Sequence, residues 1–252
     1  MTDQSESAAA EVLREPGDGE VVIDDRFCGP AESANGGYAC AMVARSMLGT
    51  AEVTLRVPPP LGRPLRVESR EAGVALLDGD VLVAEARPSA VGVDVPACVS
   101  LDEAKRAAAR YPWRDRHPYP TCFVCGPQRD AGDGLRIFPG PIDNGSLYAA
   151  PWLPEVSLAD SDGNVRAEFV WAALDCPGGI VTDLFGEVGL ILLGRLAVDI
   201  REPVKAGLPH LVQAWPIGRD GRKLNTATAL FTADGRLCAV ARAVWIELPA
   251  KS

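Results

Sequence analysis

The chain lacks any block rich in lysine and arginine, since its 25 basic residues are scattered among 34 acidic ones and the net charge is −9. Nucleic acids and anionic membrane surfaces attract positive patches, so neither is an expected partner. No stretch reaches the ~18 consecutive apolar residues that a membrane span needs, and the start, MTDQSESAAAEVLREPGDGE, has no apolar core behind a positive end. We therefore expect a cytoplasmic protein with no membrane or nucleic-acid partner.

Histidine is almost absent, and no glycine-rich nucleotide-binding loop is recognisable, because GDGLRI has neither a strand before it nor a helix after it. The two histidines, His117 and His210, each lie beside a proline in a segment typical of a loop or the start of a strand. Nucleophilic catalysis by Cys176 with a histidine would therefore need a proximity that the sequence does not predict.

Paired metal-ligand motifs are lacking too. Cys122 and Cys125 form one CxxC, whereas a closed tetrahedral zinc site usually combines two such pairs. Cys28, Cys176 and His117 are conceivable further ligands, but we expect a packed turn at the CxxC, with no metal and no cofactor. The seven cysteines are an odd number scattered along a long chain, as expected for a reducing compartment.

Apolar material is sufficient for a sizeable core, because 47% of the 252 residues are hydrophobic. Residues 1–19 are polar and without periodicity, so we expect a disordered tail there. A strand at 21–27 and a helix over 40–48, with apolar residues at i, i+3, i+4, i+7 and i+8, come next. Four short strands bounded by proline or glycine follow at 51–57, 64–70, 73–79 and 81–87.

The second half repeats this order. Strands are expected at 146–152 and 165–171, a helix near 172–185, and further strands at 193–203, 208–218, 223–232 and 236–248. The chain therefore has the pattern of a tandem duplication of an α+β unit, with two unrelated α+β domains as the alternative.

A connector, 97–117, separates the N-terminal unit, 20–96, from the C-terminal unit, 118–252. It begins a helix with a capping box formed by Ser100 and Glu103. The next segment is dense in proline, glycine and cysteine, and is expected to be an ordered loop that runs into a strand at 134–138.

Two glycine pairs occur where the helices are expected to begin. Gly36 and Gly37 lie in SANGGYACAMVARSML, and Gly178 and Gly179 in LDCPGGIVTDLF. A missing Cβ permits close approach to a sheet or a ligand, and the free N–H groups of a first helical turn can hold a developing oxyanion. Tight packing of a buried helix explains the same glycines, so both interpretations stay open.

Three motifs in this order, ANGGYACAMVARSML, CFVCGP followed by GDGLRIF, and WAALDCPGGIV, resemble the acyl-CoA thioesterases of the hotdog superfamily. The resemblance implies a tandem (double) hotdog, each unit a curled antiparallel sheet wrapped around a central helix, over about 20–96 and 118–248. It also implies an active site between the units, where a helix N-terminus supplies an oxyanion hole, a carboxylate activates water and pantetheine follows the seam.

The same resemblance places the general base at Asp175, in AALDCPGG, where an apolar environment raises the pKa of a carboxyl group. Helix capping by Asp175, with Pro177 in the first turn, is the alternative. The family's threonine and glutamine partners do not carry over, because the strands expected to hold them offer Asp199 and Arg242.

On the same basis, the amides around Gly36, Gly37, Gly178 and Gly179 are candidate substrate-binding groups. Asn35 is a candidate catalytic residue that orients a carbonyl or a water molecule, unless it is an ordinary N-cap.

These features together favour hydrolysis of an acyl-CoA or acyl-carrier thioester by water attack at the seam between two hotdog units. The alternatives are a non-catalytic acyl-ligand binding or regulatory protein on the same scaffold, and a purely structural partner protein. Basic residues of the connector, between Lys105 and Arg116, are either a patch for the CoA phosphates or a solvated helix face. Further pairing of whole chains into a homo-oligomer stays open.

Overall fold

The computed structural model describes residues 19–249, so the tail expected at 1–19 lies outside the described residues except for Gly19. Three α-helices are described, α1 (Gly36–Ala44), α2 (Leu101–Ala109) and α3 (Ala167–Ile180), with short 3-10 turns η1 (Asp25–Phe27), η2 (Val156–Leu158) and η3 (Val181–Phe185). The strands are β1 (Gly19–Val22), β2 (Ala51–Leu55), β3 (Pro64–Arg70), β4 (Gly73–Asp78), β5 (Val81–Pro88), β6 (Gly140–Pro141), β7 (Tyr148–Trp152), β8 (Ile191–Ile200), β9 (His210–Asp220), β10 (Lys223–Thr232) and β11 (Leu237–Glu247). None of the helices in this part of the chain is long and apolar enough to cross a membrane.

All these strands form one antiparallel sheet in the order β1-β3-β4-β5-β2-β8-β11-β10-β9-β7-β6. The pairing of β2 with β8 joins the two halves, with a register from Ala51↔Val198 to Thr54↔Arg195. The first half has the order β1-β3-β4-β5-β2, and the second half, starting from β7, has the equivalent order β7-β9-β10-β11-β8. In each half a helix follows the first of these strands, whereas the sequence pattern predicts a further strand before the second helix.

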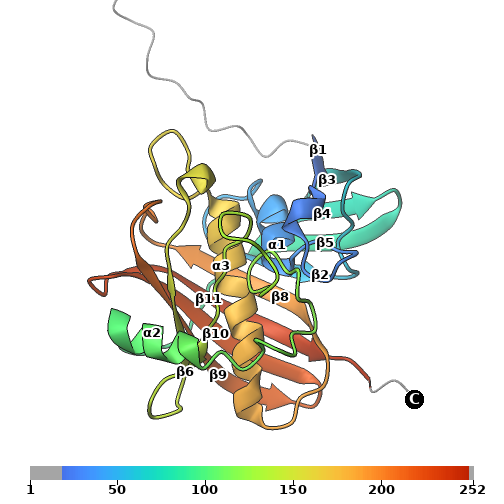
Figure 1. The fold of residues 1–252 in the computed structure, drawn as a ribbon. Helices are drawn as coiled ribbons and strands as arrows, with labels where there is room; N and C mark the ends of the chain where they lie inside the picture. Colours follow the sequence, from blue (N-terminus) through green and yellow to red (C-terminus); the bar gives the residue numbers. More distant parts are fainter. Residues whose placement is uncertain (1–18, 250–252) are drawn as a thin grey trace, which may run out of the picture.

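Helices α1 and α3 lie on the same face of the sheet (Figure 1), α1 against β2, β4 and β5 and α3 against β8 to β11. Every residue from Phe169 to Ile180 is buried, so α3 is an apolar helix surrounded by other elements. Helix α2 packs on β6 and β7 through Ala104 and Ala107. Its Ser100 cap accepts a hydrogen bond from the Glu103 N–H, as expected from the capping box.

Ion pairs connect the strands at the junction between the halves, on the outer face of the sheet, which is the face away from α1 and α3. Glu52 on β2 is only 4% exposed, and its carboxylate lies 2.6 Å from Arg87 Nη2, 3.6 Å from Arg195 Nη1 and 3.4 Å from Arg242 Nη2. These arginines come from β5, β8 and β11, so one carboxylate links four neighbouring strands. A buried carboxylate with several cationic partners avoids the cost of an unpaired charge.

The expected strand at 165–171 is wrong, because α3 begins at Ala167. This run is rich in the valine and aromatic residues that favour strands, and a helix buried on all sides leaves no polar face to reveal its period. The N-cap, Arg166, makes no side-chain cap hydrogen bond that would mark the start. The segment 134–138 is not a strand either, although its backbone hydrogen-bonds to the loop at Phe123 and Val124.

Helix α1 crosses α3 closely at Gly37, and the substitution Gly37→Ala tests this crossing. A Cβ at Gly37 would lie 2.5 Å from Asp175 Cβ and 2.7 Å from the Trp171 carbonyl oxygen, so we expect the free energy of unfolding to fall by about 1–3 kcal/mol. Urea denaturation measures it. The control is Gly36→Ala, whose Cβ would meet the Leu193 side chain, with Cδ2 nearest at 2.7 Å. Leu193 Cδ2 can rotate away, which leaves a milder contact with Leu193 Cβ at 3.1 Å. Equal losses from the two variants would therefore contradict the crossing geometry.

Candidate active site at the helix crossing

The site begins at the first turn of α1, where the expected helix start is observed. Asn35 is the N-cap, and its Oδ1 accepts a hydrogen bond from the Tyr38 N–H at 2.9 Å. The other end of this amide, Nδ2, donates to Asp175 Oδ2 at 2.9 Å, and the Gly37 N–H donates to the same oxygen at 2.8 Å. Asn35 is therefore an N-cap and also a contact between the halves, whereas its catalytic role stays a prediction.

Asp175 lies inside α3 and does not cap it, so the capping alternative is wrong. Its side chain is 2% exposed, and its Oδ1 is buried without a hydrogen-bond partner among the described residues. Burial raises the pKa of Asp175 to about 7, although the hydrogen bonds from Gly37 and Asn35 act in the opposite direction. This carboxyl group has one fixed oxygen and one unpaired oxygen, and can exchange a proton near neutral pH.

The second glycine pair does not begin a helix, which corrects the expected oxyanion role. Gly178 and Gly179 lie in the last turn of α3, where N–H groups bond to carbonyls of the preceding turn. A Cβ at Gly178 would lie 2.9 Å from Thr226 Oγ1, and one at Gly179 would lie 2.9 Å from the Trp245 ring. These glycines allow α3 to approach the sheet closely, in agreement with the packing alternative.

An apolar cavity adjoins Asp175. Its lining includes Asn35, Cys176 and Gly179, with Trp113, Ile191, Leu193 and Trp245 among its bulky apolar side chains. Trp245 Nε1 and Thr226 Oγ1 are buried without a hydrogen-bond partner within residues 19–249. The sequence analysis missed both residues, although Thr226 and Thr228 alternate on β10 toward α3, where Thr228 Oγ1 donates to the Leu174 carbonyl.

Asp199 and Arg242, which the sequence offers in place of the family's threonine and glutamine, are not among the residues that line this cavity. Arg242 pairs with Glu52 on the outer face, and Asp199 pairs with Arg201 and accepts from Thr50 Oγ1. Arg106 and Arg110 of the connector pair with Asp143, which agrees better with a solvated helix face than with a phosphate-binding patch.

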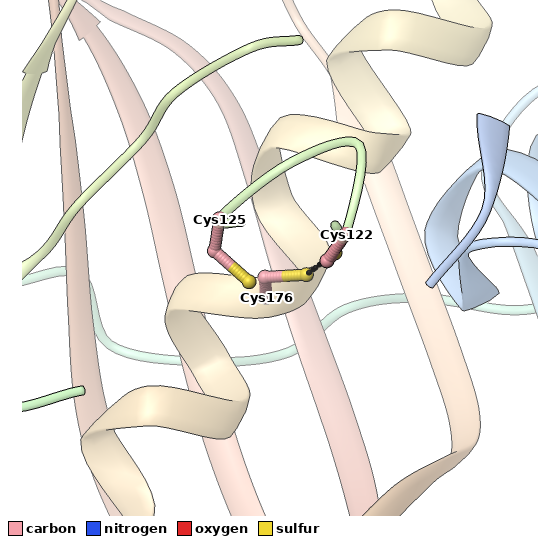
Figure 2. A group of neighbouring side chains, drawn as sticks. All are labelled: Cys122, Cys125 and Cys176. Atoms are coloured by element: carbon pink, nitrogen blue, oxygen red, sulfur yellow. Dashed lines mark hydrogen bonds between the residues drawn. The ribbon is translucent and has the colours of Figure 1, made fainter. Parts of the chain in front are cut away.

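Three cysteines meet in the lining of the same cavity. Figure 2 shows Cys122 and Cys125 of the CxxC loop pointing toward Cys176 of α3, and the three sulfurs lie within 4.8 Å of one another. His117 Nε2 lies 3.2 Å from Cys125 Sγ. A histidine therefore lies beside a cysteine, which the sequence does not predict. The three cysteines are close enough together to hold a metal ion.

Several solved structures share this fold over nearly the whole chain. The tesB protein of Mycobacterium avium subsp. paratuberculosis is 12% identical with a TM-score of 0.62, covering 94% of this chain and 95% of that chain. A candidate thioesterase II of Thermobifida fusca is 15% identical with a TM-score of 0.58, covering 92% of each chain. A candidate oleoyl thioesterase of Lactobacillus plantarum is 11% identical with a TM-score of 0.56, covering 92% and 96%.

No protein-family model and no curated protein sequence matches the chain. The structural likeness nevertheless shows that the chain shares the fold of these structures.

The double role of Asn35 is testable by stability. Asn35→Ala removes a helix cap, worth about 1 kcal/mol, and takes a donor from a buried carboxylate, which costs about 1–3 kcal/mol. We therefore expect a larger loss of unfolding free energy than from Ser100→Ala, which removes only the cap of α2. Equal losses in urea denaturation would show that the Asn35–Asp175 bond contributes nothing.

Proposed function

We propose that this chain is a double hotdog that hydrolyses an acyl-CoA or acyl-carrier thioester at the seam between units 20–96 and 118–252. The equivalent strand orders of the two halves and their pairing through β2 and β8 support the duplication. The names of the full-length structural neighbours support the reaction class. The observation that carries the proposal is the Asp175 carboxylate, fixed by the opposite helix at one oxygen and unpaired at the other.

In the proposed reaction Asp175 Oδ1 is the general base. It accepts a proton from a water molecule while the water oxygen bonds to the thioester carbonyl carbon. The tetrahedral intermediate then collapses, the carbon–sulfur bond breaks, and the thiolate leaves with the proton that Asp175 returns. The acid and the free thiol are the products, and Asp175 is ionised again.

Asn35 and Gly37 act as positioning residues in this scheme. Their hydrogen bonds to Oδ2 hold the carboxyl plane, so that Oδ1 stays directed at one place. Because the Gly37 N–H is already used by Asp175, the carbonyl oxygen needs another donor. We assign the role of donor to the carbonyl oxygen to the Trp245 N–H. It belongs to a side chain that lines the cavity, and it has no hydrogen-bond partner in the described structure.

The shape of the surrounding surface favours an apolar acyl group. The cavity beside Asp175 shares Pro30, Leu192 and Leu193 with a neighbouring groove that continues along Leu55 and Ile246. A hydrocarbon chain placed there would contact mainly apolar side chains, and burial of its surface would supply most of the binding free energy.

A second candidate is an acyl-thioester binding protein without turnover. It is favoured by the use of the Gly37 N–H for Asp175 and by the position of Gly178 and Gly179 at the end of α3. Among residues 19–249, no pair of helix-start amides therefore faces the cavity in the way that the family resemblance implies.

The test is CoA release from a panel of acyl-CoAs of increasing chain length, with free CoA measured by chromatography because the protein contains cysteines. We expect Asp175→Asn to lower the rate by about 10²–10⁴-fold, the usual contribution of a positioned general base. Asp199→Asn is the matched control, since Asp199 lies on β8, pairs with Arg201 just after that strand and is not among the residues that line the cavity. It should keep the wild-type rate.

Two results would decide against hydrolysis. Acyl-CoA binding by calorimetry without release of CoA by the wild type would favour the binding protein. Full activity of Asp175→Asn would remove Asp175 from the mechanism.

A further inference from the structure

The three cysteines near Asp175 converge from segments far apart in the sequence. Cys122 and Cys125 are each 3% exposed and Cys176 is 9% exposed. Cys122 Sγ and Cys176 Sγ lie 3.6 Å apart (Figure 2). Two thiolates on a tetrahedral zinc ion, each about 2.3 Å from the metal, would be separated by about 3.8 Å. The observed sulfur spacing therefore already suits a shared metal.

The CxxC loop closes in a tight turn, in which the Gly126 N–H donates to the Cys122 carbonyl at 2.9 Å. A Cβ at Gly126 would lie 2.5 Å from the Cys122 nitrogen, so the turn requires a glycine at that position. Cys122 Sγ and Cys176 Sγ are within hydrogen-bond distance of each other, and Asn35 Nδ2 donates to Cys176 Sγ at 3.4 Å. Donors directed at a sulfur favour the thiolate, the form that binds metals.

His117 supports the same cluster from the adjoining segment. Its Nδ1 accepts a hydrogen bond from the Tyr119 N–H at 2.8 Å, which places the proton of a neutral ring on Nε2. The Nε2–H then donates to Cys125 Sγ at 3.2 Å. In this arrangement His117 stabilises a thiolate and leaves the ligand role to the sulfurs.

We propose that Cys122, Cys125 and Cys176 bind one zinc ion through three thiolates, with the fourth position open to the cavity that Asp175 lines. Thiolates are the ligands that select zinc among common divalent ions, and three protein ligands with an open place are typical of zinc sites that accept water or substrate. Binding releases the remaining thiol protons to solvent. The inference does not rest on the proposed hydrolase, because it uses only the sulfur geometry and its donors.

The test uses the whole reduced chain, freed of metal by a chelator under anaerobic conditions. Titration with Co²⁺ should give one equivalent per chain, with thiolate-to-cobalt charge transfer and the intense visible bands of tetrahedral cobalt. Zn²⁺ should displace the cobalt, and chain made in zinc-supplemented medium should contain one zinc by elemental analysis. Because a bound metal stabilises the folded state, Zn²⁺ should also raise the Tm of the metal-free wild type.

Variants identify the ligands. We expect Cys122→Ser, Cys125→Ser and Cys176→Ser each to abolish the charge-transfer bands, whereas Cys98→Ser and Cys238→Ser, outside the cluster, keep them. We expect His117→Gln to keep the stoichiometry but to weaken affinity about 10–100-fold, as for other residues that hydrogen-bond to metal ligands.

Other results would overturn the proposal. Absence of charge-transfer bands in the reduced wild type would exclude the site, as would metal binding unchanged by Cys176→Ser. Complete loss of metal in His117→Gln would overturn the three-thiolate assignment. A Cys122–Cys176 disulfide, with no metal bound after its reduction, would identify a redox pair in place of a metal site. None of these readouts depends on CoA release, so failure of the hydrolase and failure of the metal site are distinguishable.

Discussion

The contact between Gly37 and the Asp175 carboxylate is the constraint on which the rest of this structure depends. Because Gly37 has no Cβ, the first turn of α1 lies directly against Asp175 and the backbone of α3. The same close approach buries the Asp175 side chain and gives its Oδ2 two donors, Gly37 and Asn35. Burial opposes the charge of the carboxylate more strongly than these donors favour it. The close approach of α1 to α3 at Gly37 therefore determines both the packing of the two helices and the raised pKa of Asp175.

Neither half of the chain carries this arrangement alone. Asn35 and Gly37 come from the start of α1 and Asp175 from α3, so their distance depends on how the two halves of the sheet are joined. The β2–β8 pairing sets that distance on the helix side, and Glu52 links the same strands on the outer face through its arginines. A sheet continuous across the junction is thus a requirement of the site.

Helices and strands that are marked by a local signal, such as a capping residue or a proline or glycine at the end of a run, were predicted from the sequence. Most strands lie where short alternating runs end at proline or glycine, and α2 begins at the Ser100 cap. Asn35 before two glycines located the start of α1. The start of α3 was missed because Arg166 makes no cap bond and the buried helix has no polar face. The analogy between the glycine pairs then placed Gly178 and Gly179 at the wrong end of a helix.

Contacts between distant segments could not be predicted in this way, and they determine the site. Asp175 was assigned from its resemblance, but Trp245 and the meeting of Cys176 with the CxxC loop depend on tertiary packing. Asp175 and Cys176 are consecutive on a helix, so their side chains point about 100° apart. One therefore meets α1 while the other meets Cys122 and Cys125. A rotation of α3 that shifted either contact would disturb the other, so an ion bound by the sulfurs would also fix the angle at which Asp175 meets Gly37.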